Sequence, residues 1–149
     1  MSDRYYEDFR VGQRFVSGDM TITEAGIIEF ARQWDPQPFH TDVEFANKWT
    51  FGGLVASGVH TMAATLKLWI EQGVFRACSL GAAGIGGVRF PRPVRPGDTL
   101  RVVTDVVELR PSAWRPDRGI ARIRQVTVNQ RDEAVMEQET TVFLKRRPG

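Results

Sequence analysis

The stretch GVHTMAATLKLWIEQ, residues 58–72, decides the fold of this chain. It is rich in good helix formers, and it is followed by Gly73, a residue type that commonly ends helices. We therefore expect one long helix over Gly58–Gln72. Its apolar residues recur at helical spacing and predict a buried stripe, widened by Leu68 and Trp69, that consists of Val59, Met62, Ala63, Leu66 and Ile70. A helix this apolar is expected to be buried on most sides.

The residues before this helix predict one strand and one further helix. Residues 14–21 alternate loosely in polarity and indicate a strand. The helix that follows places four apolar residues on one face at i, i+3, i+4 and i+7, namely Ile27, Phe30, Ala31 and Trp34. Asp35-Pro36-Gln37-Pro38 ends it, because proline lacks an amide proton and restricts the residue before it. A short helical turn is expected over residues 42–48.

Four strands are expected after the long helix, at residues 80–90, 99–109, 119–130 and 135–145, with turns between them. A strand, then helices, then four consecutive strands indicate the α+β class, with a five-stranded antiparallel sheet wrapped around a long central helix. The last two strands carry apolar residues and few prolines that would blunt a sheet edge: Val126, Val128, Val135, Val142 and Phe143. Because such an edge is normally paired, we expect a homodimer or a multiple of dimers.

The composition is that of an ordinary globular domain, with 149 residues, 42% hydrophobic residues and a formal net charge of +2. This charge balance does not call for a nucleic-acid partner. One cysteine, Cys78, excludes an internal disulfide and favours a cytoplasmic location. No signal peptide and no apolar run of about 20 residues is present, so we expect no membrane association. Zinc motifs such as HExxH and CxxC are absent, and no metal is expected.

Asp35 and His40 are the strongest candidates for chemistry. They are separated by five positions on a proline-stiffened segment, which can hold both groups toward one small volume at low cost in conformational entropy. A carboxylate and an imidazole placed in this way suit general acid–base catalysis on a water molecule. The alternative is that Asp35 caps a turn and His40 packs, since turns are rich in aspartate and proline for local reasons.

Ser57 and Gly58 begin the long helix, where unpaired amides and positive partial charge are exposed. Glycine at this point lets a ligand approach the backbone closely. The segment could therefore bind substrate and stabilise an oxyanion, for example that of a polarised thioester. The alternative is that Ser57 is an ordinary N-cap.

Residues 35–40 (DPQPFH), with Ala46 and Gly58 further on, resemble the signature of the MaoC-like dehydratases, the family of (R)-specific enoyl-CoA hydratases. That signature is Asp-x-Asn-Pro-x-His, followed by an alanine and by a glycine that opens the central helix. Gln37 stands where the family usually has asparagine. Residues 88–100, VRFPRPVRPGDTL, are similar to the family segment F-x-x-P-V-x-x-G-D-x-L. The resemblance runs from the first helix to the third strand.

The resemblance implies a single hotdog domain over residues 1–149 that dimerises by joining two sheets edge to edge, with active sites at the interface. It implies reversible hydration of a trans-2-enoyl-CoA to an (R)-3-hydroxyacyl-CoA, with no cofactor beyond the coenzyme A of the substrate. Asp35 and His40 would hold and activate the water, and either could take its proton. The Gly58 amide would bind the thioester oxygen. A hotdog acyl-CoA thioesterase and a non-catalytic acyl-CoA-binding module remain as alternatives.

Arg89, Arg92 and Arg95 bracket one proline-rich turn, and they are candidates for contacts to the phosphates of coenzyme A. Pro91, Pro93 and Pro96 are expected to fix the turn and to hold the guanidinium groups near one another. Arginine binds phosphate through a bidentate fork of donors. The alternative is that these arginines only solvate the turn.

Overall fold

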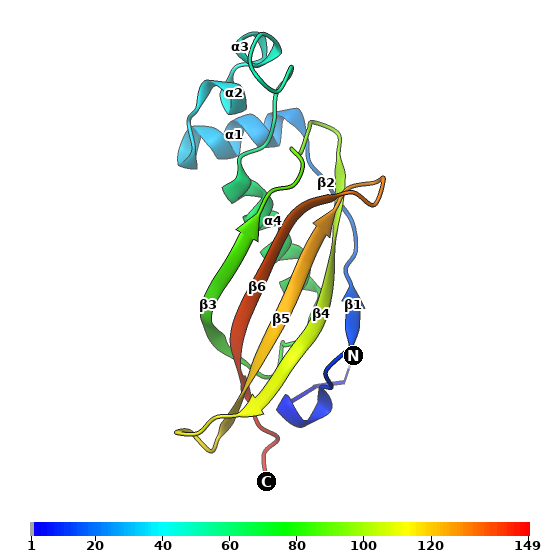
Figure 1. Cartoon of the computed structure of the whole chain (residues 1–149), viewed down its shortest axis with the longest axis vertical. Helices are drawn as coiled ribbons and strands as arrows, with labels where there is room; N and C mark the ends of the chain where they lie inside the picture. Colours follow the sequence, from blue (N-terminus) through cyan, green and yellow to red (C-terminus); the bar gives the residue numbers. More distant parts are fainter. Residues whose placement is uncertain (1) are drawn as a thin grey trace.

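The computed structural model describes residues 2–149, and it shows a six-stranded antiparallel sheet with a long helix packed against one face (Figure 1). The elements in chain order are η1 (Tyr6–Asp8), β1 (Arg14–Val16), β2 (Met20–Thr21), α1 (Glu24–Trp34), α2 (Pro38–Thr41), α3 (Val43–Asn47), α4 (Gly58–Gln72), β3 (Ser79–Arg89), β4 (Thr99–Pro111), β5 (Arg118–Val128) and β6 (Ala134–Lys145). The strand order is β1-β4-β5-β6-β3, and β2 also pairs with β4.

This is the α+β hotdog architecture that the sequence predicts, with one difference in the number of strands. The segment expected to form a single first strand is interrupted, so that β1 and β2 each pair separately with β4. Ser17 lies in the interruption and keeps the chain beside β4. Its amide donates to the carbonyl of Val102 over 2.9 Å, and its hydroxyl accepts from the Val102 amide over 2.8 Å.

The expectation that the last two strands form the sheet edge is wrong. β5 and β6 have neighbours on both sides, and the edges are β1 and β3. The valines of β5 and β6 predict edge strands only because a sequence does not reveal the order of strands in a sheet. β3 is instead the glycine-rich segment SLGAAGIGGVR, almost all of which is exposed. Three register shifts along its pairing with β6 bend it, as bulges do.

The face of α4 that the structure buries differs from the predicted stripe, although Leu68 and Trp69, which were expected to widen it, are buried. Its buried residues are Thr61, Ala64, Thr65, Leu68 and Trp69. Three residues of the predicted stripe, Val59, Leu66 and Ile70, are 53%, 59% and 60% exposed. Threonine tolerates burial here because its hydroxyl finds partners within the protein. The Thr65 hydroxyl donates to the Thr61 carbonyl over 2.8 Å and lies 2.6 Å from the hydroxyl of Thr127 on β5.

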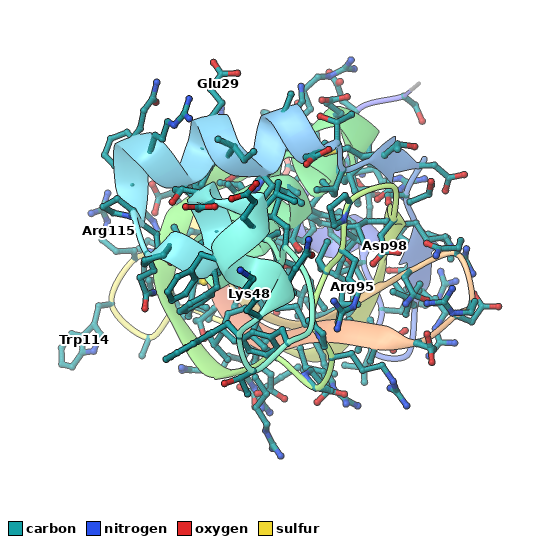
Figure 2. The ribbon with its side chains drawn as sticks, turned by 90° about the horizontal axis from the view of Figure 1, so that it is seen from above. Glu29, Lys48, Arg95, Asp98, Trp114 and Arg115 are labelled. Carbon is teal, nitrogen blue, oxygen red and sulfur yellow. The ribbon has the colours of Figure 1, made fainter. Side chains whose placement is uncertain are left out.

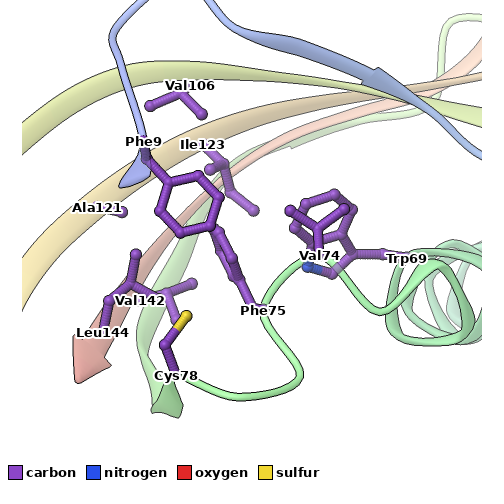
Figure 3. Packing of buried hydrophobic residues seen from close by; sticks show 10 residues of the cluster. All are labelled: Phe9, Trp69, Val74, Phe75, Cys78, Val106, Ala121, Ile123, Val142 and Leu144. Carbon is purple, nitrogen blue, oxygen red and sulfur yellow. The ribbon is translucent and has the colours of Figure 1, made fainter. Parts of the chain in front are cut away.

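Two apolar clusters hold the helices on the sheet. One lies around the end of α4 and joins Trp69 and Phe75 to Phe9 and to strands β4, β5 and β6 (Figure 3). Cys78 is buried in this cluster, and burial together with the charge of Asp8 raises the pKa of its thiol to about 11. The second cluster includes Ile27 of α1 and places the first helices against α4 and β4. Within residues 2–149, no helix has the length and apolarity needed to cross a membrane.

Candidate active site

Asp35, His40 and Gly58 line one pocket of about 400 Å³ at the N-terminal end of α4. Asp35 is the residue at which α1 ends. His40 lies on α2, a one-turn helix that the sequence pattern does not predict. Pro38 at the start of α2 explains this difference, since its fixed φ suits the first position of a helix. The predicted pair is therefore brought together, with the imidazole on a short helix.

The Asp35 carboxylate is held by two hydrogen bonds. Its Oδ2 accepts from the Ser57 hydroxyl over 2.7 Å, and its Oδ1 accepts from the Gln37 side-chain amide over 2.8 Å. Gln37, which replaces the asparagine common in the family signature, therefore still reaches the carboxylate. Its extra methylene does not prevent the contact that supports Asp35.

His40 faces the same carboxylate through Nε2, which lies 3.3 Å from Asp35 Oδ2. Its other ring nitrogen, Nδ1, lies 2.7 Å from the backbone carbonyl of Val55. A carbonyl only accepts, so Nδ1 carries a proton and donates it to Val55. This bond fixes the ring orientation and leaves Nε2 facing the Asp35 carboxylate. The His40 side chain is only 7% exposed, so the ring is locked in place.

The pKa of Asp35 lies below its ordinary value. Burial raises this pKa, but the hydrogen bonds from Ser57 and Gln37 and the field of His40 together lower it by more. Each of these contacts favours the charged carboxylate. Asp35 is therefore ionised at neutral pH, with His40 Nε2 3.3 Å from its carboxylate.

Ser57 does not face the pocket. It is fully buried, and besides donating to Asp35 its hydroxyl accepts from the Val59 amide over 3.2 Å. It is thus the N-cap of α4 and, at the same time, a support for Asp35. Its predicted contact with substrate remains a prediction, and its observed contacts make it a positioning residue.

Gly58 is the first residue of α4, and the aromatic ring of Phe90 packs directly over it. A Cβ atom at position 58 would lie 2.7 Å from Cζ of Phe90, closer than real contacts allow. Sequence reasoning linked the need for glycine to the approach of a ligand and did not identify Phe90 as part of the pocket. Phe90 follows β3 and lines the pocket together with Asp35 and His40.

The three arginines of the proline-rich turn are not gathered as expected. Arg92 lines the Asp35–His40 pocket, and its Nε lies 3.4 Å from Glu133. Arg89 is the last residue of β3, and it lines a different hollow, formed by the glycine-rich part of β3 and by mostly charged residues of β5 and β6. Arg95 donates to the carbonyl of Phe51 over 2.8 Å and so ties down the loop before α4. Figure 2 shows Arg95 beside Asp98, whose carboxylate accepts from the Arg95 amide.

His60, the second histidine, is not part of this pocket. Its ring stacks on Phe30 of α1 with centroids 4.5 Å apart and planes 10° apart. Its Nδ1 is buried without a hydrogen-bond partner, and burial lowers its pKa. These contacts are those of a residue that packs α1 against α4.

A family model described as MaoC like domain matches residues 8–131, which is most of the chain. A MaoC-like dehydratase from Rhodospirillum rubrum, known from its crystal structure, is 41% identical. The two structures superpose with a TM-score of 0.92, covering 99% of this chain and 100% of that chain.

Two curated proteins are similar over nearly their whole length. An uncharacterised protein of Bacillus subtilis, YdeM, is 34% identical over 94% of this chain and 98% of its own. The 3-hydroxybutyryl-CoA dehydratase of Methylorubrum extorquens is 30% identical over 96% of this chain and 85% of its own.

The hydrogen bond from Ser57 generates the first prediction. Replacing Ser57 with alanine removes a donor to the charged carboxylate, so the pKa of Asp35 should rise toward its ordinary value. Loss of the N-cap should also reduce stability by about 1 kcal/mol. Carboxyl-carbon NMR titration measures the first effect and denaturant unfolding the second. Thr61→Val, which removes a buried hydroxyl one turn further on without touching Asp35, is the control. An unchanged Asp35 titration in Ser57→Ala would refute the assignment of Ser57.

Proposed function

Because the chain belongs to the family of MaoC-like domains, we propose that it catalyses the reversible addition of water to a trans-2-enoyl-CoA thioester. The product would be an (R)-3-hydroxyacyl-CoA. Coenzyme A enters as part of the substrate, and the reaction requires no other cofactor. The single observation that carries the proposal is the pair formed by ionised Asp35 and His40 at the start of α4, 3.3 Å apart in a shared pocket.

The geometry of the pair suits the handling of one water molecule. Asp35 and His40 both line the pocket, and we assign Asp35 Oδ2 and His40 Nε2, which lie 3.3 Å apart, to hydrogen bonds with a water held between them and the substrate. As the water oxygen bonds to C3, one of its protons passes to the pair. The electron pair of the C2=C3 bond moves toward the thioester carbonyl, and C2 then receives a proton. One proton is taken up and one delivered, so the pair returns to its starting state.

The start of α4 supplies the electrostatic part of the mechanism. The first amides of a helix have no partner within it and carry positive partial charge. The Val59 amide is already bonded to Ser57, so the Gly58 amide is the donor we assign to the thioester oxygen. Donors of this kind are effective because they are in place before charge develops on the oxygen.

The α4 and β3 surface supports the further proposal that the working form is a homodimer. The exposed Leu66 and Ile70 of α4 lie on the same cavity as Ile85 of β3, which is 52% exposed. The outer edge of β3 has no strand beside it within residues 2–149. Contiguous apolar surface beside an unpaired strand edge is normally covered. A second copy joined along β3 would cover both at once.

The acid–base pair generates a direct kinetic prediction. Asp35→Asn and His40→Ala should each lower kcat for hydration by about two to four orders of magnitude. If both act on one water, the double variant should be hardly slower than the slower single variant. The assay follows loss of enoyl-thioester absorbance and, in parallel, release of free thiol. Near-normal hydration by either folded variant would refute the mechanism. Thiol release would indicate a thioesterase, and absence of any reaction would indicate a binding module.

Arg92 generates a prediction about how the coenzyme A part of the substrate is bound. It is the one member of the arginine trio that lines the pocket, and we propose that it attracts the phosphates of coenzyme A. Arg92→Glu should raise KM for an enoyl-CoA, more strongly at low salt, and should leave KM for the corresponding enoyl-pantetheine thioester unchanged. Arg89→Glu, on a different hollow, is the matched control. An equal rise in KM with both thioesters would show that Arg92 supports the pocket rather than the phosphates.

The exposed face of α4 generates a prediction about assembly. A charge at Leu66 would be buried against a second copy, so Leu66→Glu should convert the dimer to a monomer, as measured by sedimentation velocity. Trp114, which is 91% exposed at the tip of the β4–β5 hairpin and projects from the molecule in Figure 2, gives the control variant Trp114→Glu. That variant should remain dimeric. A wild-type protein that sediments as an active monomer would overturn the proposed dimer.

A further inference from the structure

A cavity of about 500 Å³ between α4 and the sheet has an apolar wall with a polar row in its floor. Met62, Leu66 and other apolar residues of α4, together with Ala82 and Ile85 of β3, form the wall. The floor contains Gln125 of β5 and Gln138 of β6, which are paired across the two strands. Both glutamines are buried, and Gln138 is only 6% exposed. Buried glutamine is uncommon, and it is normally fully hydrogen-bonded.

The hydrogen bonds of this polar row all run in one direction, from Gln138 through Gln125 to Thr104. The side-chain amide of Gln138 donates to Gln125 Oε1 over 3.0 Å, and the amide of Gln125 donates to the hydroxyl of Thr104 over 3.2 Å. Gln138 is the last member of this row, and its Oε1 is buried with no partner. A buried acceptor without a donor costs about 1–3 kcal/mol. Gln138 lines the cavity, but its Oε1 has almost no accessible surface there, so a ligand reaches this unused group only when the Gln138 side chain turns toward it.

The cavity adjoins the Asp35–His40 pocket along the first turns of α4. Gly58 and Thr61 line the pocket, whereas Val59 and Met62, the residues that follow each of them, line the cavity. On β6, Val135 lines the pocket and Gln138 the cavity, which places them about 10 Å apart along the strand. An acyl chain whose thioester carbonyl lies at Gly58 can therefore extend past α4 to the glutamine row.

We propose that this cavity holds the acyl chain of the substrate and that Gln138 binds a hydroxyl group carried on that chain. The inference rests on the proposed function, because it assigns the acyl group of the same thioester. The described residues that line the cavity include no lysine or arginine, so a carboxylate on the chain would find no counter-charge. If the side-chain amides of Gln125 and Gln138 both rotate by half a turn, Gln138 offers an N–H donor in place of its Oε1 acceptor. A hydroxyl pairs with either group, since it both donates and accepts.

The proposed second copy covers the mouth of the cavity rather than its floor. The residues that would meet it are the exposed ones of the rim, among them Val59, Leu66 and Ile85. Gln138 lies on the sheet beneath them and keeps its free group. A closed, largely apolar space with a few hydrogen-bonding side chains is typical of sites that select a ligand by its polar groups.

The test is a binding comparison that does not depend on turnover. The probes are saturated butanoyl-, hexanoyl- and octanoyl-CoA and the three counterparts with a terminal hydroxyl, titrated into the dimer by calorimetry. At one chain length the hydroxyl form should bind wild type at least about tenfold more tightly than the methyl form. Gln138→Met should lose this preference.

A matched control is available on α4. Gln72 also has a buried Oε1 without a partner, and its amide donates to the carbonyl of Val16 over 2.9 Å, but it does not line the cavity. Gln72→Met should therefore keep the preference for the hydroxyl form. Circular dichroism establishes whether each variant folds, and if Gln138→Met does not, the wild-type comparison alone decides.

The outcomes separate this inference from the proposed function. Hydration of crotonyl-CoA without a preference for any hydroxyl probe would overturn the assignment of Gln138 and leave the hydratase intact. A clear preference without hydration of any enoyl-CoA would overturn the hydratase and leave the binding assignment intact. Retention of the preference in a folded Gln138→Met variant would also overturn the assignment.

Discussion

The hydroxyl of Ser57 joins the long helix to the carboxylate on which the site depends. It accepts from the Val59 amide and so begins α4, and it donates to Asp35 at the end of α1. One buried group therefore sets the position of the helix N-terminus relative to the acid–base pair. The His40–Val55 hydrogen bond adds the third fixed point, because it aims the imidazole at the same carboxylate. Helix start, carboxylate and imidazole are held together before any substrate arrives.

The sequence was a reliable guide wherever a local pattern is sufficient. The long helix begins at Gly58 and ends at Gln72, and Gly73 stops it in a left-handed conformation with φ of 75°. Proline at two alternate positions ends α1 after Trp34, and the Asp35–His40 spacing brings the two groups into one pocket. These features follow from helix termination and from short chain separations.

The sequence was a poor guide wherever the answer depends on what lies opposite a residue. The buried face of α4 was misassigned because Thr61 and Thr65 read as polar, although their hydroxyls are satisfied inside the protein. In the folded sheet β3 is an edge strand, whereas the valine-rich β5 and β6 lie inside the sheet. Arg89 and Arg92 are close in sequence yet line different hollows, because one belongs to a strand and the other to the turn after it. The packing of Phe90 on Gly58 could not be predicted from the local sequence pattern around either residue.

The most direct test of the central claim, that Asp35 and His40 add water to C3 of an enoyl thioester, is the fate of the water oxygen. The protein is incubated with crotonyl-CoA in water enriched in oxygen-18, and the products are analysed by mass spectrometry and chiral chromatography. The account predicts one heavy oxygen in the 3-hydroxyl group of (R)-3-hydroxybutyryl-CoA, with the thioester intact. Heavy oxygen in a free carboxylate, or crotonyl-CoA recovered with no 3-hydroxybutyryl-CoA formed, would contradict it.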